Sequence, residues 1–269
     1  MKILFLTDLY YSAKGREYFK EDLFLSNILK EHFDLVLCHP KNSISFEDDV
    51  DLILFRNTGS VLGFKDVYNS FKKRVNDNNL NTFNEFTGKA DMCGKQYLID
   101  LFNDSFPVIP TIDDIQDFNK LPDVKEYVIK PKDGADSIGM EFLSKDELLE
   151  RDLKDMLIQP KIDFEYEVSF YFINDKFEYA LYGPDKNKRW ELEKYICSDE
   201  DLEFAKKFIE WNTIEYGIQR VDACRTSDGR LLLVELEDLN PYLSLLELDN
   251  TTRNKFINDL INVMKEEFE

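Results

Sequence analysis

Short apolar runs alternate with helix-like segments along the first ~80 residues of the chain. Three runs have the character of strands: KILFLTDLY at 2–10, DLVLCHP at 34–40 and DLILFR at 51–56. Apolar residues recur at the spacing of a helix face between the first two runs: Leu25, Ile28, Leu29 and Phe33. Strands that alternate with helices predict a parallel sheet in an α/β unit, and the turns after its strands form a candidate ligand-binding edge.

The pattern changes near Lys89. A helix-like segment, KADMCGKQYLIDLF, comes first, and a loop marked by prolines follows it. Five strand-like runs then have the spacing of hairpins: YVIKP, GMEFL, DMLIQPKI, YEVSFYFIN and KFEYALYG. A capping box at Ser144–Glu147 starts a helix among them, Ser198 precedes a helix that runs to roughly Glu215, and the residues after Thr251 form a terminal helix. This part of the chain is α+β rather than doubly wound.

The net charge of the chain argues against one class of function, the binding of nucleic acids. The chain has 34 lysines and arginines against 54 acidic residues, which gives a net charge of −20 at pH 7. Non-specific binding to nucleic acid needs an excess of cations, so no nucleic-acid partner is expected. An anionic ligand would need a local cationic pocket or a bound metal ion.

Cysteines and apolar runs indicate the compartment. The four cysteines have no CxxC spacing, and the chain has only two histidines, so neither a zinc site nor a disulfide framework is expected. Cys93 and Cys224 are interpreted as packing residues, since no nucleophile pairing with a familiar spacing is present. No apolar run approaches the ~20 residues that span a bilayer. We therefore expect a cytoplasmic protein without a membrane partner, and the sequence specifies no oligomeric state.

The stretch YVIKPKDGADSIGMEFL, which begins at Tyr127, joins two strand-like runs by a glycine-containing loop. It contains neither GxxxxGK[ST] nor GxGxxG. Pro131 favours an extended Lys130, and Gly134 and Gly139 would let the backbone fold over an anion and direct N–H groups at it. The loop is a candidate phosphate flap between antiparallel strands. The alternative is a plain polar hairpin, which the loop's aspartates favour because they would repel a phosphate.

The last hairpin, RVDACRTSDGRLLLVELE, brings acidic residues together if Asp228 and Gly229 form a two-residue type I′ turn. That register sets two pairs opposite each other on one face: Asp222 with Glu235, and Arg220 with Glu237. Three further side chains are expected on the same face: Cys224, Leu231 and Leu233.

Two carboxylates ~4 Å apart repel by roughly 4 kcal/mol at an effective dielectric constant of about 20, so something must offset the repulsion. Carboxylate oxygens without histidine suit Mg²⁺ or Mn²⁺. Asn240 is a further candidate oxygen ligand. The alternatives are an exposed acidic edge and a plain cross-strand ion pair between Arg220 and Glu237.

A lysine strand with a glycine flap, the run LIQPKI followed by EYEVS, and a hairpin with D…E-x-E occur here in that order. This combination resembles the ATP-grasp superfamily of carboxylate–amine and carboxylate–thiol ligases over nearly the whole chain. The string VELEDLNPYLSL resembles an E-x-E…P-x-L subset, which includes an O-ureido-serine cyclo-ligase and glutathione-synthetase-like proteins. The resemblance implies an α/β plus α+β protein: an N-terminal doubly wound domain at 1–85, followed by an ATP-grasp fold of two α+β subdomains, at 86–160 with the lysine strand and flap and at 161–269 with the metal-binding hairpin.

The resemblance also implies a nucleotide site, with ATP and Mg²⁺ (or Mn²⁺) as cofactors. The phosphates would meet two lysines and the flap: Lys95, Lys130, Lys132, Gly134, Ser137 and Gly139. The adenine would meet the hinge: Gln159 and the backbone of Lys161 and Ile162. The ribose would meet Glu165, with Glu167 as the competing choice.

The remaining implied roles concern the metal and the chemistry. The metal ligands would be Asp222, Glu235 and Glu237. The catalytic cations would be Arg220 at the reacting carbonyl and Lys188 or Arg189 at the γ-phosphate. Asn240, and Arg56 at the end of the third strand, are candidate substrate-binding residues, although Arg56 has the alternative role of a surface cation. Tyr10, Tyr11 and Tyr242 lie near the expected edges of the site.

The implied reaction is ATP-dependent ligation of a small carboxylate, an amino acid or peptide, to an amine through an acyl phosphate, with release of ADP and phosphate. Its partners would be small-molecule carboxylate and amine substrates. Two departures from the family pattern stand out: Glu237 replaces the common Asn of E-x-N, and Asp136 lies in the flap. They motivate an alternative, a catalytically weak ATP-binding regulatory or scaffold protein. A small-molecule phosphotransferase is a further alternative.

Overall fold

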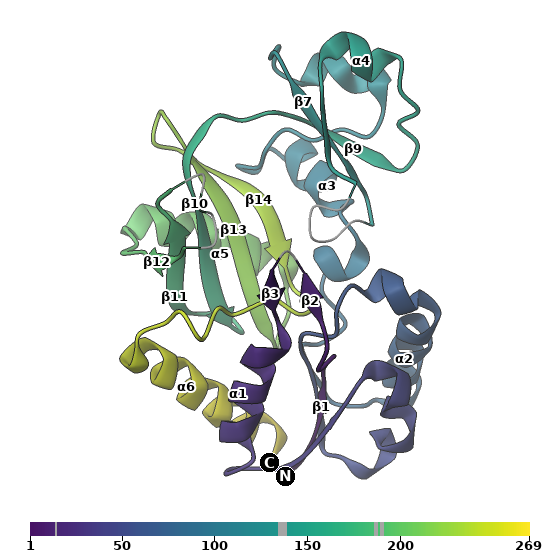
Figure 1. Ribbon diagram of the computed structural model, residues 1–269, viewed down its shortest axis with the longest axis vertical. Helices are drawn as coiled ribbons and strands as arrows, with labels where there is room; N and C mark the ends of the chain where they lie inside the picture. Colours follow the sequence, from purple (N-terminus) through teal and green to yellow (C-terminus); the bar gives the residue numbers. More distant parts are fainter. Residues whose placement is uncertain (14, 134–138, 186–187, 189–190) are drawn as a thin grey trace.

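The computed structural model describes residues 1–13, 15–133, 139–185, 188 and 191–269. Four residues discussed above lie outside this part of the chain: Gly134, Asp136, Ser137 and Arg189. Figure 1 shows a parallel sheet in the lower half of the molecule, a large antiparallel sheet in the middle and a small antiparallel sheet at the top. Within the described residues, no helix has both the length and the apolar character required to span a membrane.

The N-terminal unit is a doubly wound α/β domain, as predicted. Its parallel sheet has the order β4-β1-β5-β6, made of β1 (Lys2–Leu6), β4 (Asp34–Cys38), β5 (Leu52–Phe55) and β6 (Thr82–Phe83). Ile3 and Phe5 pack with α1 (Phe19–Leu29), whereas Leu4 and Leu6 pack with α2 (Lys65–Asn78). Since alternate residues of a strand point to opposite faces, the two helices cover opposite faces of the sheet.

Short elements connect the strands and helices of this unit. They are β2 (Ser12–Ala13), β3 (Arg16–Glu17), and the 3₁₀ helices η1 (Pro40–Ser45), η2 (Glu47–Asp49) and η3 (Val61–Phe64). The β2–β3 hairpin extends from the N-terminal domain toward the middle sheet (Figure 1). It therefore brings N-terminal residues close to the C-terminal part of the chain.

The small sheet at the top has the order β8-β7-β9 and is antiparallel. Its strands are β7 (Tyr127–Pro131), β8 (Glu141–Leu143) and β9 (Met156–Pro160), and its helices are η5 (Ile115–Lys120) and α4 (Lys145–Leu149). The capping box of Ser144 and Glu147 starts α4, as predicted. The loop after Lys130 joins antiparallel strands, which agrees with the position expected for the flap.

The middle sheet has five antiparallel strands in the order β12-β11-β10-β13-β14. They are β10 (Phe164–Ile173), β11 (Lys176–Gly183), β12 (Glu193–Lys194), β13 (Ile218–Thr226) and β14 (Leu231–Glu237). One face packs against α3 (Tyr97–Asn103) and α5 (Asp199–Asn212). Side chains of the sheet also share a core with α1, α6 (Asn250–Phe268) and the N-terminal sheet. This shared core fixes the N-terminal domain against the C-terminal subdomain.

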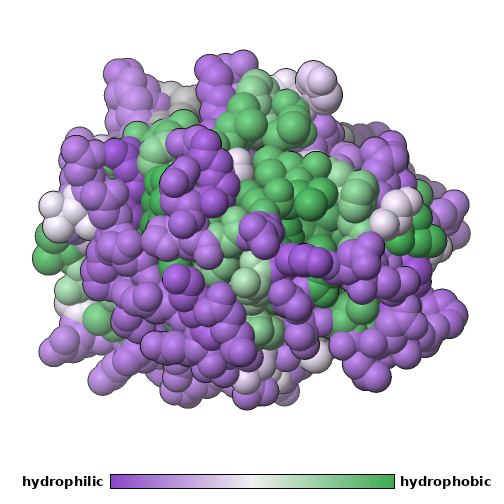
Figure 2. Space-filling model, turned by 90° about the horizontal axis from the view of Figure 1, so that it is seen from below, coloured by the Kyte–Doolittle hydropathy of each residue, from purple (hydrophilic) through white to green (hydrophobic). Residues whose placement is uncertain are grey.

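The two chain termini meet at the lower end of the molecule (Figure 1), where the N-terminal ammonium lies 3.5 Å from Oε1 of Glu269. Seen from this end, most of the surface is hydrophilic, and apolar side chains gather near the centre of the face (Figure 2).

The prediction of a helix from Lys89 is wrong for the first half of that segment. The chain forms the 3₁₀ helix η4 (Asp91–Cys93), turns at Gly94 with φ of +85°, and begins α3 only at Tyr97. Asp91 Oδ1 accepts hydrogen bonds from the N–H groups of Asp238 and Leu239, at 2.6 and 2.9 Å. Asp238 in return accepts from the N–H groups of Ala90 and Met92. These long-range bonds hold the segment in a turn, so Lys95 lies in a loop rather than in a helix.

The two-residue turn predicted for the last hairpin is also wrong. The N–H of Thr226 donates to the carbonyl of Arg230 at 2.9 Å, which leaves a three-residue turn with Gly229 at φ of +86°. A register shift between Asp222 and Ala223 compensates, so Asp222 still faces Glu235 and Arg220 still faces Glu237. Because a one-residue slip changes the face, Leu231 and Leu233 pack in the core on the α5 side instead of beside the carboxylates.

Candidate functional site

Two adjoining cavities lie among the three sheets. The interdomain cavity, of about 440 Å³, is lined by residues of the N-terminal domain, the segment around η4 and the end of β14. The intersheet cavity, of about 590 Å³, is lined by the small and middle sheets. Five charged residues line both cavities: Arg16, Lys95, Arg220, Glu235 and Glu237. The cavities therefore meet at the hairpin whose carboxylates the sequence singled out.

Five of the ten residues predicted to bind a nucleotide line the intersheet cavity. They are Lys95, Lys130, Gln159, Lys161 and Ile162. Apolar side chains complete the walls, among them Ile109, Met140, Phe142, Val168 and Leu181. This mixture and the volume are typical of a small-molecule site.

Glu167, and not Glu165, lines this cavity. The side chain of Glu165 is exposed, because the pairing of β10 with β13 is irregular between Phe164 and Tyr166. Of the two residues considered for the ribose, only Glu167 therefore lies at the intersheet cavity. The segment DFEYE gave no sign of this irregularity, which depends on the neighbouring strand.

Lys130 is held in an unusual electrostatic environment. It lies in β7 and lines the intersheet cavity, where burial, together with the nearby charge of Lys95, lowers its pKa to about 7. An anion bound beside the two ammonium groups would relieve their repulsion. The arrangement is therefore suited to a phosphate.

The other residues predicted for the flap and hinge are partly engaged within the protein. The Nζ of Lys132 lies 2.5 Å from Asp113 Oδ2, and Lys132 lines the interdomain cavity rather than the intersheet one. Gly139 has φ of +75°, and a Cβ there would lie 3.0 Å from Pro131 Cγ, so the flap must return through a glycine at this position.

At the hinge, Gln159 donates from Nε2 to Thr111 Oγ1 at 2.7 Å. The N–H of Lys161 donates to the carbonyl of Glu126 at 3.0 Å, and its ammonium pairs with Glu126 Oε2 at 2.5 Å. Since that N–H is used in the sheet, a ligand would meet the carbonyl of Lys161 and the backbone of Ile162.

Arg220 joins the carboxylates of the hairpin. Its guanidinium donates to both oxygens of Asp222, at 2.9 and 2.8 Å, to Glu237 Oε1 at 2.5 Å and to the carbonyl of Tyr242 at 2.8 Å. Ser169 Oγ also donates to Asp222 Oδ1 at 2.6 Å. The cross-strand ion pair of Arg220 and Glu237 is thus present, and it offsets the repulsion between the acids. Burial nevertheless raises the pKa of Glu237 to about 8, and the Arg220 charge opposes that shift.

The donor set of the hairpin fits a hard divalent cation in its chemistry. Asp222, Glu235 and Glu237 offer carboxylate oxygens, which are the ligands Mg²⁺ and Mn²⁺ prefer. Among the described residues, however, no three ligating side chains already converge at metal-binding distance. Arg220 and Lys95 hold the carboxylates instead, since Lys95 forms an ion pair with Glu235. The positive charges of Arg220 and Lys95 thus neutralise the carboxylates, as a bound metal ion would.

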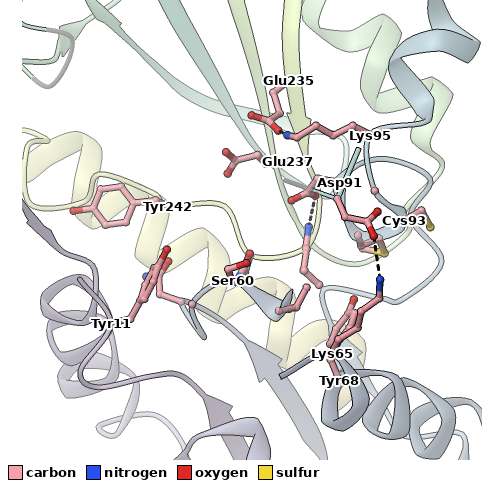
Figure 3. A pocket seen from close by; sticks show the side chains of 18 of the residues that line it. Tyr11, Ser60, Lys65, Tyr68, Asp91, Cys93, Lys95, Glu235, Glu237 and Tyr242 are labelled. Carbon is pink, nitrogen blue, oxygen red and sulfur yellow. Dashed lines mark hydrogen bonds and ion pairs between the residues drawn. The ribbon is translucent and has the colours of Figure 1, made fainter. Parts of the chain in front are cut away.

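Figure 3 shows the interdomain cavity, with Tyr11 and Tyr242 on one side, Lys65 and Tyr68 on the other, and Glu235 above them. Of the tyrosines noted from the sequence, Tyr11 and Tyr242 line the cavity, whereas the side chain of Tyr10 is 91% exposed. The sequence reasoning missed further lining residues: Arg16, Tyr18, Lys65, Tyr68 and Lys72.

Arg16 is positioned by aromatic side chains. Its guanidinium lies 5.6 Å from the ring centroid of Tyr242, and the ring of Tyr18 lies between those of Tyr242 and Tyr11, 4.9 and 5.0 Å from them. One sequence signal could have identified Arg16 as a site residue: it follows the first strand of an α/β unit, where ligand-binding turns are expected.

Arg56, a candidate for substrate binding, lines neither cavity, and it is not a surface cation either. Its side chain is 1% exposed and donates to Glu21 Oε1 at 3.1 Å and to the carbonyl of Pro241 at 3.0 Å. Glu21 also accepts from the N–H groups of Leu243 and Leu245, both at 2.9 Å. Arg56 therefore ties the N-terminal sheet to the segment after β14, because a buried carboxylate of α1 faces it.

Of two other predicted site residues, Asn240 lies at the site and Lys188 does not. Asn240 lines the interdomain cavity, and its Nδ2 lies 3.3 Å from the carbonyl of Arg56. Lys188 is exposed, pairs with Glu191 at 3.0 Å and lines neither cavity, so the structure does not bring it to the site. Arg189, the alternative cation, lies outside the described residues.

Comparison with known proteins identifies the fold. No family model and no curated protein sequence matches the chain. Among solved structures, D-cycloserine synthetase DcsG superposes with a TM-score of 0.75 at 17% identity, covering 98% of this chain and 100% of that one. D-alanine–D-alanine ligase from Bacillus anthracis complexed with ATP gives a TM-score of 0.68 at 14% identity and covers 99% of both chains. The ATP-grasp ligase PsnB complexed with a minimal precursor gives 0.65 at 13% identity, covering 97% of this chain and 98% of that one.

These alignments cover nearly the whole chain, and the observed sheets agree with the doubly wound domain and the two α+β subdomains that the resemblance implied. The chain therefore has the ATP-grasp fold, with an N-terminal doubly wound domain.

Proposed function

We propose that this protein is an ATP-dependent ligase that joins a small carboxylate to an amine and releases ADP and phosphate. The observation that carries the proposal is the junction of two cavities at one set of charged residues: Arg16, Lys95, Arg220, Glu235 and Glu237. A ligase of this kind needs a nucleotide and a carboxylate substrate side by side, with their reacting ends at a common cationic centre.

In this proposal the intersheet cavity holds ATP as a substrate. Lys95 and Lys130 bind its phosphates, and the apolar walls enclose the adenine. Gln159 and the backbone of Lys161 and Ile162 contact the base edge, and Glu167 binds the ribose. The flap that starts at Lys132 covers the phosphates, which excludes water from the reaction.

Asp222, Glu235 and Glu237 would hold Mg²⁺ (or Mn²⁺). When bound, the ion neutralises charge on the phosphate oxygens and orients them. Arg220 already contacts Asp222 and Glu237, so it keeps these carboxylates in place beside the reacting groups.

The proposed reaction has two steps. An oxygen of the substrate carboxylate attacks the γ-phosphorus, the bond from that phosphorus to the oxygen of ADP breaks, and an acyl phosphate forms. The amine then attacks the acyl carbon, loses a proton to solvent, and phosphate leaves with the electron pair of the carbon–oxygen bond. The protein supplies orientation and positive charge, with Arg220 beside the developing oxyanion.

The interdomain cavity supports a small substrate. Its volume of about 440 Å³ is enough for an amino acid or a short peptide end. Two of the similar structures are enzymes named for small molecules, a D-cycloserine synthetase and a D-alanine–D-alanine ligase, whereas PsnB was solved with a precursor. We place the reaction in the cytoplasm, since the four cysteines are free.

A second candidate is a catalytically weak ATP-binding regulatory protein. The pairs of Lys95 with Glu235 and of Arg220 with Glu237 favour it, because they satisfy the carboxylates internally. In that case nucleotide would bind without turnover.

Calorimetric titration of ATP and ADP, with and without Mg²⁺, tests the proposal on the parent and on Lys130→Ala and Glu235→Ala. Lys125→Ala, at an exposed lysine near β7, is the matched control. We expect micromolar, metal-dependent binding in the parent and the control that Lys130→Ala abolishes. ADP release is then measured with pairs of carboxylates and amines.

Each outcome of these assays discriminates between the candidates. Release that needs both substrates supports the ligase. Release with an acceptor alone, accompanied by a phosphorylated product, supports a phosphotransferase. Tight ATP binding without release supports the regulatory protein, and no nucleotide binding at all refutes the nucleotide-dependent functions together.

A further inference from the structure

The interdomain cavity contains a buried hydroxyl without a partner. Tyr68, in α2, is only 4% exposed and lines the cavity, yet its hydroxyl forms no hydrogen bond with any described residue. A buried polar group without a partner is destabilising by about 1–3 kcal/mol, so such groups usually serve a ligand or an ordered water molecule. Burial is the main cause of a raised pKa at Tyr68, so its hydroxyl keeps its proton and acts as a donor.

A lysine lies beside this hydroxyl on the same helix. Lys72 is one turn after Tyr68, and its Nζ is 4.7 Å from the centroid of the Tyr68 ring. Lys72 also lines the cavity, and no carboxylate of a described residue lies within 4.0 Å of it. Lys65, at the start of the same helix, is paired with Asp133 at 3.0 Å. The wall formed by α2 thus offers one O–H donor and one ammonium group to the same region of the cavity.

The charge of the cavity differs from that of the chain. Of the described residues, six lysines and arginines and four carboxylic acids line it, whereas the whole chain has 34 cationic and 54 acidic residues. Two of those acids, Glu235 and Glu237, are the proposed metal ligands. A third, Asp91, accepts two backbone N–H groups at one oxygen, and burial and Asp238 raise its pKa well above the usual value, which weakens its repulsion of an anion.

We propose that Tyr68 and Lys72 form a distal subsite that binds a second carboxylate group of the substrate. The substrate class would then be an acidic amino acid, or a peptide that ends in one. The inference rests on the proposed function and deepens it, because it names what the ligase selects.

The geometry of a carboxylate fits this subsite. One of its oxygens accepts from the hydroxyl of Tyr68, and the other pairs with the ammonium of Lys72. Figure 3 shows Tyr68 on the wall opposite Tyr11 and Tyr242, with the carboxylates of Glu235 and Glu237 on a different side of the cavity. A substrate seated on Tyr68 therefore extends toward the centre where Arg16 and Arg220 line the cavity. The reacting carboxylate and the recognised carboxylate occupy different ends of one molecule.

The test is calorimetric titration of amino acids into the protein with and without the ATP analogue AMPPNP and Mg²⁺. The probes are the D and L forms of glutamate and aspartate, with alanine and serine as neutral counterparts and O-phospho-L-serine as a phosphate counterpart. The variants are Tyr68→Phe, which keeps the ring, and Lys72→Gln. Lys73→Gln is the matched control, since Lys73 is the next residue of the helix, points to solvent and pairs with Asp77.

We expect at least one acidic amino acid to bind the parent about 10-fold or more tightly than the neutral ones, a difference of about 1.4 kcal/mol. Tyr68→Phe and Lys72→Gln each reduce this preference severalfold and leave AMPPNP affinity within about twofold, while Lys73→Gln leaves both unchanged.

Equal binding of acidic and neutral probes, binding of none of them, or a preference that survives both substitutions would overturn the inference. A preference for O-phospho-L-serine alone would overturn the assignment to a carboxylate. Failure of the ligase proposal is distinguishable, because it is measured by the binding of AMPPNP. If the parent does not bind AMPPNP, the ligase proposal fails. The titrations without nucleotide still decide whether the subsite selects a carboxylate.

Discussion

Lys95 and Glu235, which line both cavities, form an ion pair where the cavities meet. One of these residues was expected at the phosphates of a nucleotide and the other at a metal ion, and in the structure they neutralise each other. Only 10% of the Lys95 side chain and 28% of the Glu235 side chain are exposed, so the pair is shielded from solvent. A ligand that binds to either residue must therefore compete with the other.

Glu235→Gln removes one side of this competition. We expect it to reduce the gain in ATP affinity from Mg²⁺ by about 10-fold or more, since a carboxylate oxygen is lost, while affinity without Mg²⁺ is kept or increased because Lys95 becomes available to the phosphates. Calorimetric titration at several Mg²⁺ concentrations measures both quantities. Glu193→Gln, at an exposed acid of β12, is the control. An unchanged metal dependence in Glu235→Gln would remove this residue from the proposed metal site.

Lys130 is expected to take up a proton when ATP binds. Burial and Lys95 lower its pKa to about 7, so at pH 8 it is largely neutral in the nucleotide-free protein. Phosphate oxygens favour the charged form and raise that pKa, so binding at pH 8 draws in up to about one proton, while binding at pH 6 draws in almost none. Titration in buffers with different ionisation enthalpies measures the uptake. Lys130→Met should abolish the difference between the two pH values, and Lys125→Met should keep it.

Gly88 lies where no side chain fits. A Cβ there would fall 2.2 Å from Asp238 Oδ2 and 2.8 Å from Met92 Cε, and Asp238 is the residue whose hydrogen bonds hold the turn at η4. Gly88→Ala is expected to lower the free energy of unfolding by about 1–3 kcal/mol, measured by urea denaturation. Gly63→Ala, where a Cβ meets nothing within 4 Å, should change it by less than about 0.5 kcal/mol. Equal effects of the two substitutions would contradict this explanation.

Arg16 is expected to act on the carboxylate substrate rather than on the nucleotide alone. It lines both cavities and is fixed over the ring of Tyr242 by the β2–β3 hairpin. Arg16→Ala should reduce kcat/KM for the carboxylate by about 10–100-fold with an ATP KM within about threefold of the parent value, and Arg16→Lys should recover only part of the loss because it lacks the planar guanidinium.

Steady-state ADP release with each substrate varied in turn measures these constants for the Arg16 variants. Arg230→Ala serves as the control, because Arg230 is exposed and pairs with Asp228 in the turn of the last hairpin. If both Arg16 variants kept parental kinetics, the β2–β3 hairpin would have only a structural role.

The pairing of Asp222 with Glu235 shows how a local error can leave the site prediction intact. The two-residue turn was wrong, yet the register at the carboxylates was right, because the bulge after Asp222 compensates for the extra turn residue. Turn chemistry is local, whereas the bulge lies several residues away from the turn, and beyond it Leu231 and Leu233 pack in the core with α5. The faces of Leu231 and Leu233 were predicted wrongly for the same reason.

Arg56 and Lys95 illustrate what local sequence patterns cannot specify. Both lie near strand or helix signals that are clear in the sequence, but their partners, Glu21 and Glu235, are distant along the chain. Periodicity places a residue on an element and says nothing about which distant side chain faces it. The cation expected to bind substrate is therefore buried in an ion pair, and the expected phosphate lysine is paired with a carboxylate.

The sequence by itself determined most of the succession of strands and helices, the N-terminal parallel sheet, the lysine strand and the acidic hairpin. These features follow from apolar periodicity, capping boxes and glycine or proline positions, which act over a few residues. The ATP-grasp fold was indicated by the family resemblance that the order of these motifs carries. Only the tertiary structure decided that Glu167 rather than Glu165 lines the intersheet cavity, that Arg16 reaches both cavities, and that Tyr68 has a buried hydroxyl without a described partner. Those outcomes depend on a register irregularity between strands, a hairpin that crosses between domains and the packing of α2, all of which are set by contacts between residues far apart in the chain.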